Sequence, residues 1–407
     1  MNNVPKLRFK GFSDEWEEKQ LSEMLYESKL KNKDLQFKKE DVLSVSGEYG
    51  IVNQIQHLGR SYAGVSVANY GVVKKGDIVY TKSPLKNNPY GIIKANKCTD
   101  GIVSTLYAVY SCKENFSDVF IDYYFQLDDN TNKYVRPLVQ KGAKNDMKIN
   151  NQYFLSGTIN VPKRNEQEKI ANFLTKVDKL IEKQDEKVNN LEQYKKGMMQ
   201  RIFSQEIRFK KDDRVEYPEW TEISLDKICT KIGDGLHATP NYVESSDIKF
   251  INGNNIKNGK IVTDETTKSI TIEELEKYPN YLSEDTVLMS INGTIGNIGY
   301  YCGESVLLGK SVAFININKE SCIKEFIGYV LASDKKQNYF YSELTGTTIK
   351  NLSLKTIRNT LINLPILEEQ TKISNFLSKV DSILEKEKEK LEELRVWKKG
   401  LLQGMFV

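Results

Sequence analysis

One segment of this chain occurs twice, at an offset of 203 residues (364 minus 161), and both copies are spaced as a long helix. Residues 161–203 align without a gap with residues 364–406, and about half of the aligned positions are identical. An internal repeat sets the architecture before any local feature is considered. The repeat therefore predicts two similar halves, each ending in one long helix.

The apolar residues of both copies follow a heptad spacing. The predicted seam residues are Ile170, Leu174, Val177, Ile181, Val188 and Leu191 in the first copy, and Ile373, Leu377, Val380, Leu384, Leu391 and Leu394 in the second. Such spacing requires a partner helix and produces a left-handed supercoil. The seam is polar at equivalent places, at Gln184 and Glu387 and at Lys195 and Lys398. Polar seam residues reduce stability but can fix the register of the pair.

The obvious partner of each predicted helix is the other copy, and the alternative is a helix of another protein. The first helix leaves one globular part and ends at the next, so the second helix can pair with it only by running back. We therefore predict an antiparallel coiled coil with a globular domain at each end. The repeat also predicts a pseudo-twofold axis through the middle of the coiled coil.

The globular parts are predicted to mix strands and helices. Short β-type runs at 76–80, 102–110, 286–291 and 311–317 alternate with Gly and Asn turns, and helical stretches occur near 116–127 and 324–333. The segment Leu7-Arg8-Phe9-Lys10 is echoed by Ile207-Arg208-Phe209-Lys210, so the repeat extends beyond the helices. The predicted fold is α+β, with mixed α/β domains at 1–160 and 207–363 and coiled-coil helices at 161–206 and 364–407. Each globular part is long enough for its own core.

Composition places the chain among cytoplasmic proteins of a reducing compartment. It contains no apolar run long enough to cross a membrane and no signal peptide, so no membrane partner is expected. The five cysteines form no C-x-x-C pair, which argues against a disulfide framework or a thiolate metal site. The net charge of +4 permits a local basic patch for nucleic acid but does not demand one.

Sequence patterns for catalysis are missing. The chain has two histidines and no H-E-x-x-H or paired metal-ligand spacing. The segment 87–90 resembles the N-P-P-Y loop of adenine methyltransferases, but its second residue is Asn88 and no cofactor loop precedes it. The segment 303–311 resembles a phosphate-binding loop with one residue too many, and the glycines of 293–299 are typical of turns between strands. We predict a non-catalytic chain that binds no metal or cofactor.

The whole arrangement resembles the specificity (S) subunit of type I restriction–modification systems. The phrase I-G-D-G-L-H-A-T-P at 232–240, followed by I-N-G-N-N-I at 251–256, is similar to the opening of a target-recognition domain of that family. The start of each helix, with Pro162, Glu166 and Gln167 in one copy and Pro365, Glu369 and Gln370 in the other, resembles the start of the family's helices. The segment 100–104 (D-G-I-V-S) also resembles a phrase of these domains. The first domain lacks the D-G-x-H opening, so the two domains are expected to read different sequences.

This resemblance implies that the chain is a DNA-recognition subunit that reads a bipartite, asymmetric site, one half with each domain. It implies double-stranded DNA, two modification (methyltransferase) subunits and restriction (translocase–endonuclease) subunits as partners. S-adenosylmethionine, ATP and Mg would be held by those partners, whose reactions are adenine methylation and DNA cleavage. The coiled coil would set the spacing between the two half-sites.

Polar and cationic residues in turns are the candidates for contact with bases and phosphates. In the first domain they are Arg60, Tyr62, Lys82, Lys86, Asn87, Asn88, Tyr90, Lys141, Lys144 and Asn145. In the second domain they are Gly235, His237, Thr239, Asn254, Asn255, Lys257, Asn292, Thr347, Thr348 and Lys350. The segment 141–145 is expected to take the place that the loop 345–351 takes in the second domain.

Three alternatives to this interpretation remain open. The chain could be the specificity subunit of a related system in which methyltransferase and nuclease are fused in one partner, which the neighbouring genes would show. It could be a coiled-coil spacer that positions two protein-binding domains, which a gel shift with DNA and the modification subunit would distinguish. It could also be an unrecognised nuclease, which a metal-dependent cleavage assay on the isolated chain would reveal.

Overall fold

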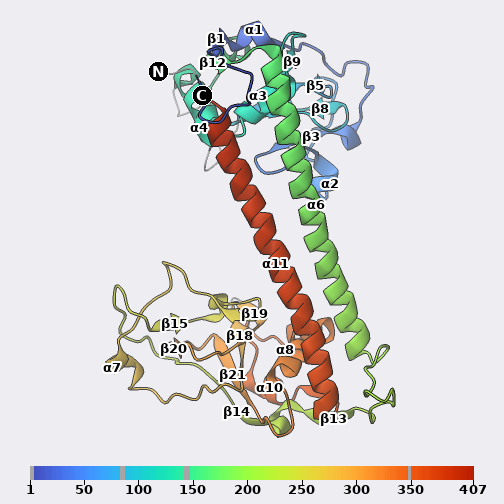
Figure 1. Ribbon diagram of the computed structural model, residues 1–407, viewed down its shortest axis with the longest axis vertical. Helices are drawn as coiled ribbons and strands as arrows, with labels where there is room; N and C mark the ends of the chain where they lie inside the picture. The colour runs from blue at the N-terminus through green and yellow to red at the C-terminus, as the bar shows by residue number, and fades with distance from the viewer. Residues whose placement is uncertain (1–3, 83–87, 142–146, 347–349) are drawn as a thin grey trace. The chain divides into compact units, whose positions relative to one another are not determined.

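The structure is a computed structural model that describes residues 4–82, 88–141, 147–346 and 350–407. The chain divides into two compact units, each of which contains one mixed domain and parts of both long helices (Figure 1). Unit 1 consists of Met1–Asp185 and Glu389–Val407, and unit 2 consists of Glu186–Lys388. The units are therefore described one at a time.

Each unit is built on a four-stranded antiparallel sheet with the same strand order. Unit 1 has the order β2-β9-β6-β7, and unit 2 has the order β14-β21-β18-β19. The strands of the first sheet are β2 (Leu25–Glu27), β6 (Ile78–Thr81), β7 (Ile92–Ala95) and β9 (Tyr107–Cys112). Those of the second are β14 (Cys229–Asp234), β18 (Thr286–Asn292), β19 (Thr294–Tyr300) and β21 (Val312–Ile317). The shared order confirms that the repeat includes the domains.

Smaller strand pairs and short helices complete each domain. Unit 1 adds β1 (Glu17–Gln20), β3 (Leu43–Ser46), β4 (Gly50–Asn53), β5 (Gly71–Val73), β8 (Gly101–Val103), β10 (Gln140–Lys141), β11 (Met147–Lys148) and β12 (Thr158–Val161). Its helices are α1 (Leu21–Met24), α2 (Gln54–Leu58), α3 (Asp118–Tyr124), α4 (Asp128–Val135) and α5 (Asn151–Phe154). Unit 2 adds β13 (Thr221–Ser224), β15 (Lys249–Ile251), β16 (Ile256–Lys257), β17 (Lys260–Ile261), β20 (Val306–Leu308) and β22 (Leu361–Leu364). Its helices are α7 (Ile272–Leu275), α8 (Lys324–Ala332), α9 (Asp334–Ser342) and α10 (Leu354–Arg358). Short 3₁₀ turns occur in unit 1 at Lys39–Asp41 and Arg136–Leu138, and in unit 2 at Leu225–Ile228 and Gly253–Asn255.

The two repeated segments are continuous helices, α6 (Arg164–Phe203) and α11 (Leu367–Met405). Within each unit they run antiparallel, as the ion pairs between them show (Figure 1). In unit 1, Asp178 pairs with Lys398 at 2.7 Å and Asp185 pairs with Arg395 at 3.1 Å, so the numbers rise on one helix and fall on the other. The predicted fold class and the antiparallel pairing are confirmed.

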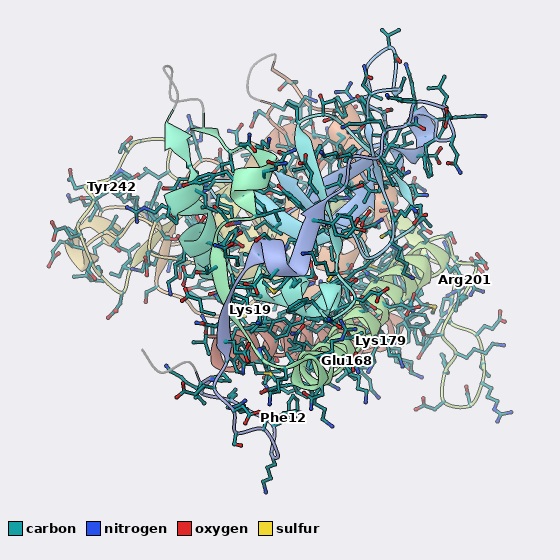
Figure 2. All side chains as sticks on the ribbon, turned by 90° about the horizontal axis from the view of Figure 1, so that it is seen from above. Phe12, Lys19, Glu168, Lys179, Arg201 and Tyr242 are labelled. Atoms are coloured by element: carbon teal, nitrogen blue, oxygen red, sulfur yellow. The ribbon has the colours of Figure 1, made fainter. Side chains whose placement is uncertain are left out.

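The predicted seam residues face inward in the structure. Ile170, Leu174, Val177, Val188, Ile373, Leu377, Val380, Leu384 and Leu391 are buried, and Ile181, Leu191 and Leu394 are half-buried. The solvent-facing side of α6 carries residues such as Glu168 and Lys179 (Figure 2). The heptad therefore separates a packed face from a charged one.

The polar seam lysines are paired in the same way in both units. Lys398 contacts Asp178 at 2.7 Å, and the Asp178 carboxylate accepts a 2.7 Å hydrogen bond from the hydroxyl of Tyr123 on α3. In unit 2, Lys195 contacts Asp381 at 2.6 Å, and Tyr329 on α8 donates to that carboxylate at 2.8 Å. Each lysine thus joins the two long helices and the domain, which explains a polar residue at a seam position.

The repeated Glu-Gln pair at the start of each helix binds residues of the adjoining domain, including its first residues. Arg8 donates two hydrogen bonds to the buried carboxylate of Glu166, at 2.8 and 2.9 Å. Arg208 does the same to Glu369, at 3.3 and 2.8 Å. The adjacent Gln167 accepts a bond from the backbone of Ser117 at the start of α3. These contacts join residues that are distant in sequence.

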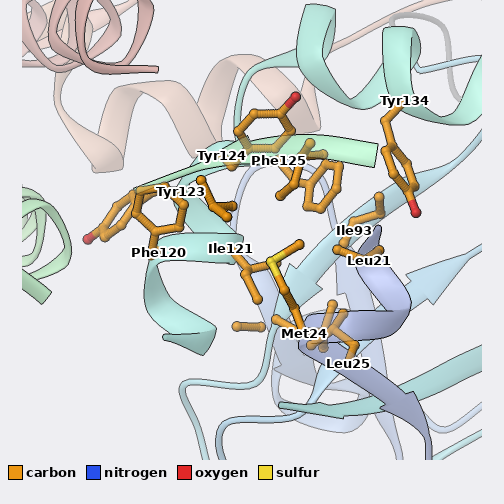
Figure 3. Close-up of a cluster of buried hydrophobic side chains, with 14 of the residues drawn as sticks. Leu21, Met24, Leu25, Ile93, Phe120, Ile121, Tyr123, Tyr124, Phe125 and Tyr134 are labelled. Carbon is orange, nitrogen blue, oxygen red and sulfur yellow. The ribbon is translucent and has the colours of Figure 1, made fainter. Parts of the chain in front are cut away.

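The main core of unit 1 lies between the sheet, α3 and the long helices (Figure 3). Phe120, Ile121 and Tyr123 of α3 are almost fully buried there, with Leu21 and Met24 of α1. The predicted helical stretches near 116–127 and 324–333 are thus confirmed as α3 and α8. The predicted run at 102–110 is divided between β8 and β9, whereas the runs at 76–80, 286–291 and 311–317 correspond to β6, β18 and β21.

One local prediction was wrong. The glycine-rich segment 293–299 was expected to form turns, but Thr294–Tyr300 is strand β19 and only Gly293 occupies the turn. A side chain on Gly296 would lie 2.1 Å from the Gln337 side chain on α9, and one on Gly299 would lie 3.0 Å from Ile256. Gly296 has a φ of +84°, in the left-handed region that favours glycine, whereas Gly299 allows Ile256 to approach the strand closely.

Candidate nucleic-acid interface

The D-G-x-H segment of the second domain follows β14 and turns against the end of β20. Gly235 is required there, because an added Cβ would lie 2.2 Å from the backbone oxygen of Leu308. The turn leaves His237 exposed, with its Nε2 at 2.8 Å from Oδ2 of Asp234. Thr239 is also exposed, two residues further on. The segment therefore presents polar side chains on a backbone held by the sheet.

The N-G-N-N segment forms a tight turn beside this one. Asn254 at its tip is exposed, whereas Asn255 is buried and bonded within the domain. The Asn255 side chain accepts from the backbone of Asn252 at 3.0 Å and donates to the carbonyl of Val262 at 3.0 Å. We therefore leave Asn255 out of the proposed interface and keep Asn254. Lys257 is exposed but lies on β16, which pairs with β17.

Further loops meet these two segments. The backbone N–H of Gly253 donates to Oγ of Ser311, and the backbone N–H of Lys310 donates to the carbonyl of Leu236. Asn292 at the β18–β19 turn forms an antiparallel bridge with Asn351. We call the segments 234–239, 252–254, 292–294, 309–311 and 350–351 together the loop cluster of unit 2. It joins most of the predicted residues of this domain.

The loop cluster also contains a residue that the sequence analysis missed. Lys310 is exposed and directly follows Gly309, which bridges to Leu236 in the D-G-x-H segment. Its segment resembles a phosphate-binding loop in sequence, and that pattern does not predict a position beside Leu236. Lys310, His237 and Lys350 are all exposed, and they place polar or cationic groups on three different loops of the cluster. Thr347 and Thr348 lie outside the described residues.

The candidates of the first domain lie on separate loops. Arg60 and Tyr62 are exposed after α2, and the guanidinium lies 4.6 Å from the centre of the tyrosine ring. Lys82 is half-buried after β6, and burial lowers the pKa of its ammonium. Tyr90 is half-buried, and its carbonyl accepts a 2.7 Å bond from the hydroxyl of Tyr80. Asn88 is buried and donates to Asp128 at 2.7 Å, so we leave it out of the interface.

Topology relates these loops to the loop cluster of unit 2. The connection between β6 and β7 corresponds to the β18–β19 turn, because both strand pairs hold the same places in their sheets. The β10–β11 pair likewise corresponds to the bridge between Thr345 and Asn351. Lys141 lies at the end of β10, and its side chain is outside the described residues. Lys86, Asn87, Lys144 and Asn145 also lie outside the described residues.

Two absences apply to the described part of the chain. No group of three or more His, Cys, Asp or Glu residues there could hold a metal ion. No helix there is both long and apolar enough to cross a membrane.

A repeated pair of mixed domains, each built on the same four-stranded sheet and each holding part of two antiparallel helices, defines a class of two-domain proteins. The sequence model of the type I restriction modification DNA specificity domain matches residues 13–193 and 217–395. The chain therefore belongs to this family, as its sequence motifs had suggested.

Individual relatives agree with this assignment. The chain is 29% identical over 261 residues to the type I restriction enzyme MjaVIII specificity subunit of Methanocaldococcus jannaschii, a match that covers 61% of each chain. The chain spans about three fifths of the length of the curated relatives it matches. The fold is similar to the crystal structure of the type I restriction–modification S subunit from M. genitalium, with a TM-score of 0.58, 15% identity and 99% of both chains covered. A second chain, from a structural study of assembly and conformational transition in the type I restriction–modification system, gives a TM-score of 0.56 at 16% identity, with 95% and 96% of the two chains covered. At these identities the two structures show the fold alone.

Proposed function

We propose that this chain is the DNA-recognition subunit of a type I restriction–modification complex, and that each domain reads one half of a bipartite, asymmetric site. The observation that carries the proposal is the loop cluster of unit 2, where polar side chains from several loops gather on a rigid sheet. Loops held by a rigid scaffold are suited to reading base edges, because their side chains are positioned before binding. The first domain has a different opening segment and is proposed to read different bases.

The exposed residues of the loop cluster divide by the contact that each can make. Asn254 carries an amide that can pair with a base edge, and His237 can donate or accept a hydrogen bond. Lys310 and Lys350 are suited to phosphates, which attract cations without regard to sequence. The Oδ2 atom of Asp234 lies 2.8 Å from Nε2 of His237, and this contact orients the imidazole ring. We therefore propose that Asn254 and His237 determine which bases are recognised, and that Lys310 and Lys350 contribute affinity for DNA of any sequence.

Exposed apolar residues on the helices support two copies of a modification subunit as partners. In unit 1, Leu180 on α6 is 52% exposed and Trp397 on α11 is 45% exposed. In unit 2, their repeat equivalents Ile383 and Tyr194 are 42% and 50% exposed. Exposed apolar groups that recur at equivalent places mark a docking surface used twice. We therefore propose that each unit of the chain docks one modification subunit.

In this proposal, catalysis belongs to the partners. The modification subunits would methylate adenine with S-adenosylmethionine, and restriction subunits would use ATP and Mg to translocate and cut DNA. This chain would select the site and, through its two continuous helices, set the spacing between half-sites. The isolated chain should accordingly show no methyl transfer, ATP hydrolysis or cleavage, and detection of any of these in a homogeneous preparation would contradict a non-catalytic role.

The proposal is tested by measuring DNA binding of the chain together with its modification subunit at several salt concentrations. Lys310→Gln should weaken binding to every sequence and reduce the slope of log affinity against log salt by about one. Lys179→Gln removes a similar exposed cation from α6 (Figure 2) and should leave the slope unchanged. Equal slopes for both variants and the wild type would remove the loop cluster from the DNA interface.

A further inference from the structure

The two units differ at one equivalent place beside the long helices. In unit 1, Tyr124 on α3 packs against Phe406, with ring centres 6.0 Å apart, and Trp16 lies 6.3 Å from the same phenylalanine. All three rings are buried, and Figure 3 shows Tyr124 among the side chains of this core. The chain's own aromatic residues therefore fill this part of unit 1.

In unit 2 the same place is left partly empty. The sequence match of α3 with α8 aligns Phe120 with Phe326, Tyr123 with Tyr329 and therefore Tyr124 with Val330. Valine lacks the ring that fills the site in unit 1. Trp220 and Phe203, the equivalents of Trp16 and Phe406, are only half-buried.

A cavity of about 430 Å³ occupies this place in unit 2. Its floor is apolar and is formed by Met199 and Phe203 of α6, Trp220, Val330 of α8 and Leu384 of α11. Cavities of this size, with an apolar floor and a few polar groups, are typical of small-molecule sites. All of the lining residues belong to unit 2.

The rim of the cavity carries several charges, most of which are already paired. Lys195 contacts Asp381 at 2.6 Å, and Lys196 contacts Asp334 at 3.4 Å. The rim carboxylate of Glu192 contacts Lys388 at 2.5 Å. These three pairs leave no net charge on the part of the rim that they form.

Two rim lysines are not neutralised in this way. Lys335 is exposed and makes no ion pair with any residue that the structure describes. The ammonium of Lys336 donates to the carbonyl of Leu361, a neutral partner, and burial lowers its pKa. Both lysines lie in the first turn of α9, where the helix dipole also favours an anion. The carboxylate of Glu222 attracts the Lys336 ammonium without forming an ion pair, and the two lysines leave this side of the rim positive.

We propose that this cavity binds a small amphipathic anion, namely an aromatic body that carries one carboxylate or a similar acidic group. The aromatic body takes the place that Tyr124 holds in unit 1 and stacks near Trp220 and Phe203. The acidic group faces Lys335 and Lys336. Because such a ligand contacts α6, α8, α9 and α11 at once, its binding stabilises unit 2. The inference does not depend on DNA recognition.

The test uses the full chain and the fluorescent probe 8-anilinonaphthalene-1-sulfonate, an aromatic anion whose emission rises in apolar sites. We expect one saturable site per chain, with energy transfer from Trp220. The uncharged analogue N-phenyl-1-naphthylamine, which has the same rings without the sulfonate, should bind about tenfold more weakly, the factor expected for one lost charge-assisted contact. The double variant Lys335→Gln, Lys336→Gln should remove this difference while keeping the weak binding of the neutral probe.

The decisive variant is Val330→Tyr, which copies the side chain of unit 1 and should abolish saturable binding of the probe. Ser333→Leu narrows the same cavity from its rim and should weaken binding independently, in case the first variant does not fold. Circular dichroism verifies the fold of each variant. A wild-type chain without saturable binding, or native-like variants that bind the probe as the wild type does, would overturn the proposal.

Discussion

Two leucines on the first half of α6 allow the packing role of the helix to be separated from its proposed docking role. Leu174 is 0% exposed in the seam of unit 1, whereas Leu180 is 52% exposed on the same helix. Truncation of a fully buried leucine to alanine costs about 2–5 kcal/mol, because apolar contacts are lost and a cavity remains. Truncation of an exposed leucine usually changes stability by less than about 0.5 kcal/mol. Leu174→Ala should therefore destabilise unit 1, and Leu180→Ala should not.

The structure also sets the size of the expected thermal shift. Unit 1 contains about 200 residues, a size at which 1 kcal/mol shifts Tm by roughly 2–4 °C. Leu174→Ala should therefore lower the transition of unit 1 by roughly 4–20 °C in differential scanning calorimetry. Leu174→Asp, which places a charge in the buried seam, should cost several kcal/mol and prevent assembly with the modification subunit, and Leu377→Asp should act in the same way in unit 2.

Leu180→Ala serves as the matched control because it removes the same atoms from the same helix. Its Tm should equal that of the wild type, but its affinity for the modification subunit should fall if the exposed pair Leu180 and Trp397 is a docking surface. Equal Tm losses for Leu174→Ala and Leu180→Ala would refute the seam assignment. Normal assembly of Leu174→Asp would refute it as well.

Three further predictions follow from other sites. Arg208→Ala leaves the Glu369 carboxylate buried without its guanidinium partner and should lower the free energy of urea unfolding by about 3–5 kcal/mol. The control Arg214→Ala, on the surface, should change it by almost nothing. Equal losses for the two variants would show that the Arg208–Glu369 ion pair is dispensable. The ammonium of Lys277, with the amides of Asn241, lowers the pKa of Glu274 to about 2, so its contribution to stability is complete above its ordinary value of 4.5 and is lost as the pH falls from there toward 2. The urea midpoint of the wild type should thus fall more steeply over that range than that of Glu274→Gln, and parallel curves would contradict the assignment. Joint substitution of Thr347, Thr348 and Lys350 should change the methylated motif in one half-site only, whereas an unchanged motif and unchanged affinity would remove this loop from the interface.

The sequence predicted the helices and their pairing because both follow from local spacing. The heptad defines α6 and α11, and the order of the chain requires them to run antiparallel. The lysines at seam positions could be noticed in the sequence, but their partners could not, because Asp178 and Lys398 are brought together only by the folded helices. The same is true of Arg8 and Glu166, whose contact joins residues 158 positions apart.

The candidate site was predicted only in part. The D-G-x-H segment was predicted from the sequence. In the structure, however, Gly235 is needed because β20 approaches it closely, and the Asn255 side chain stabilises its own turn. Lys310 was missed because its position beside Leu236 depends on a bridge between segments that are more than 70 residues apart. The strand Thr294–Tyr300 is not predicted by its sequence, because glycines at this spacing are typical of turns and the contact of Gly299 with Ile256 forms only in the folded domain.

The central claim is that this chain selects a bipartite DNA site for methylation by its partners. Sequencing of modified bases in a host that carries the gene with its modification subunit, compared with the same host without the gene, tests this directly. We expect adenine methylation that depends on the gene and falls at one asymmetric motif of two defined parts separated by unspecified bases. Absence of gene-dependent methylation, or methylation at a single continuous motif, would contradict it.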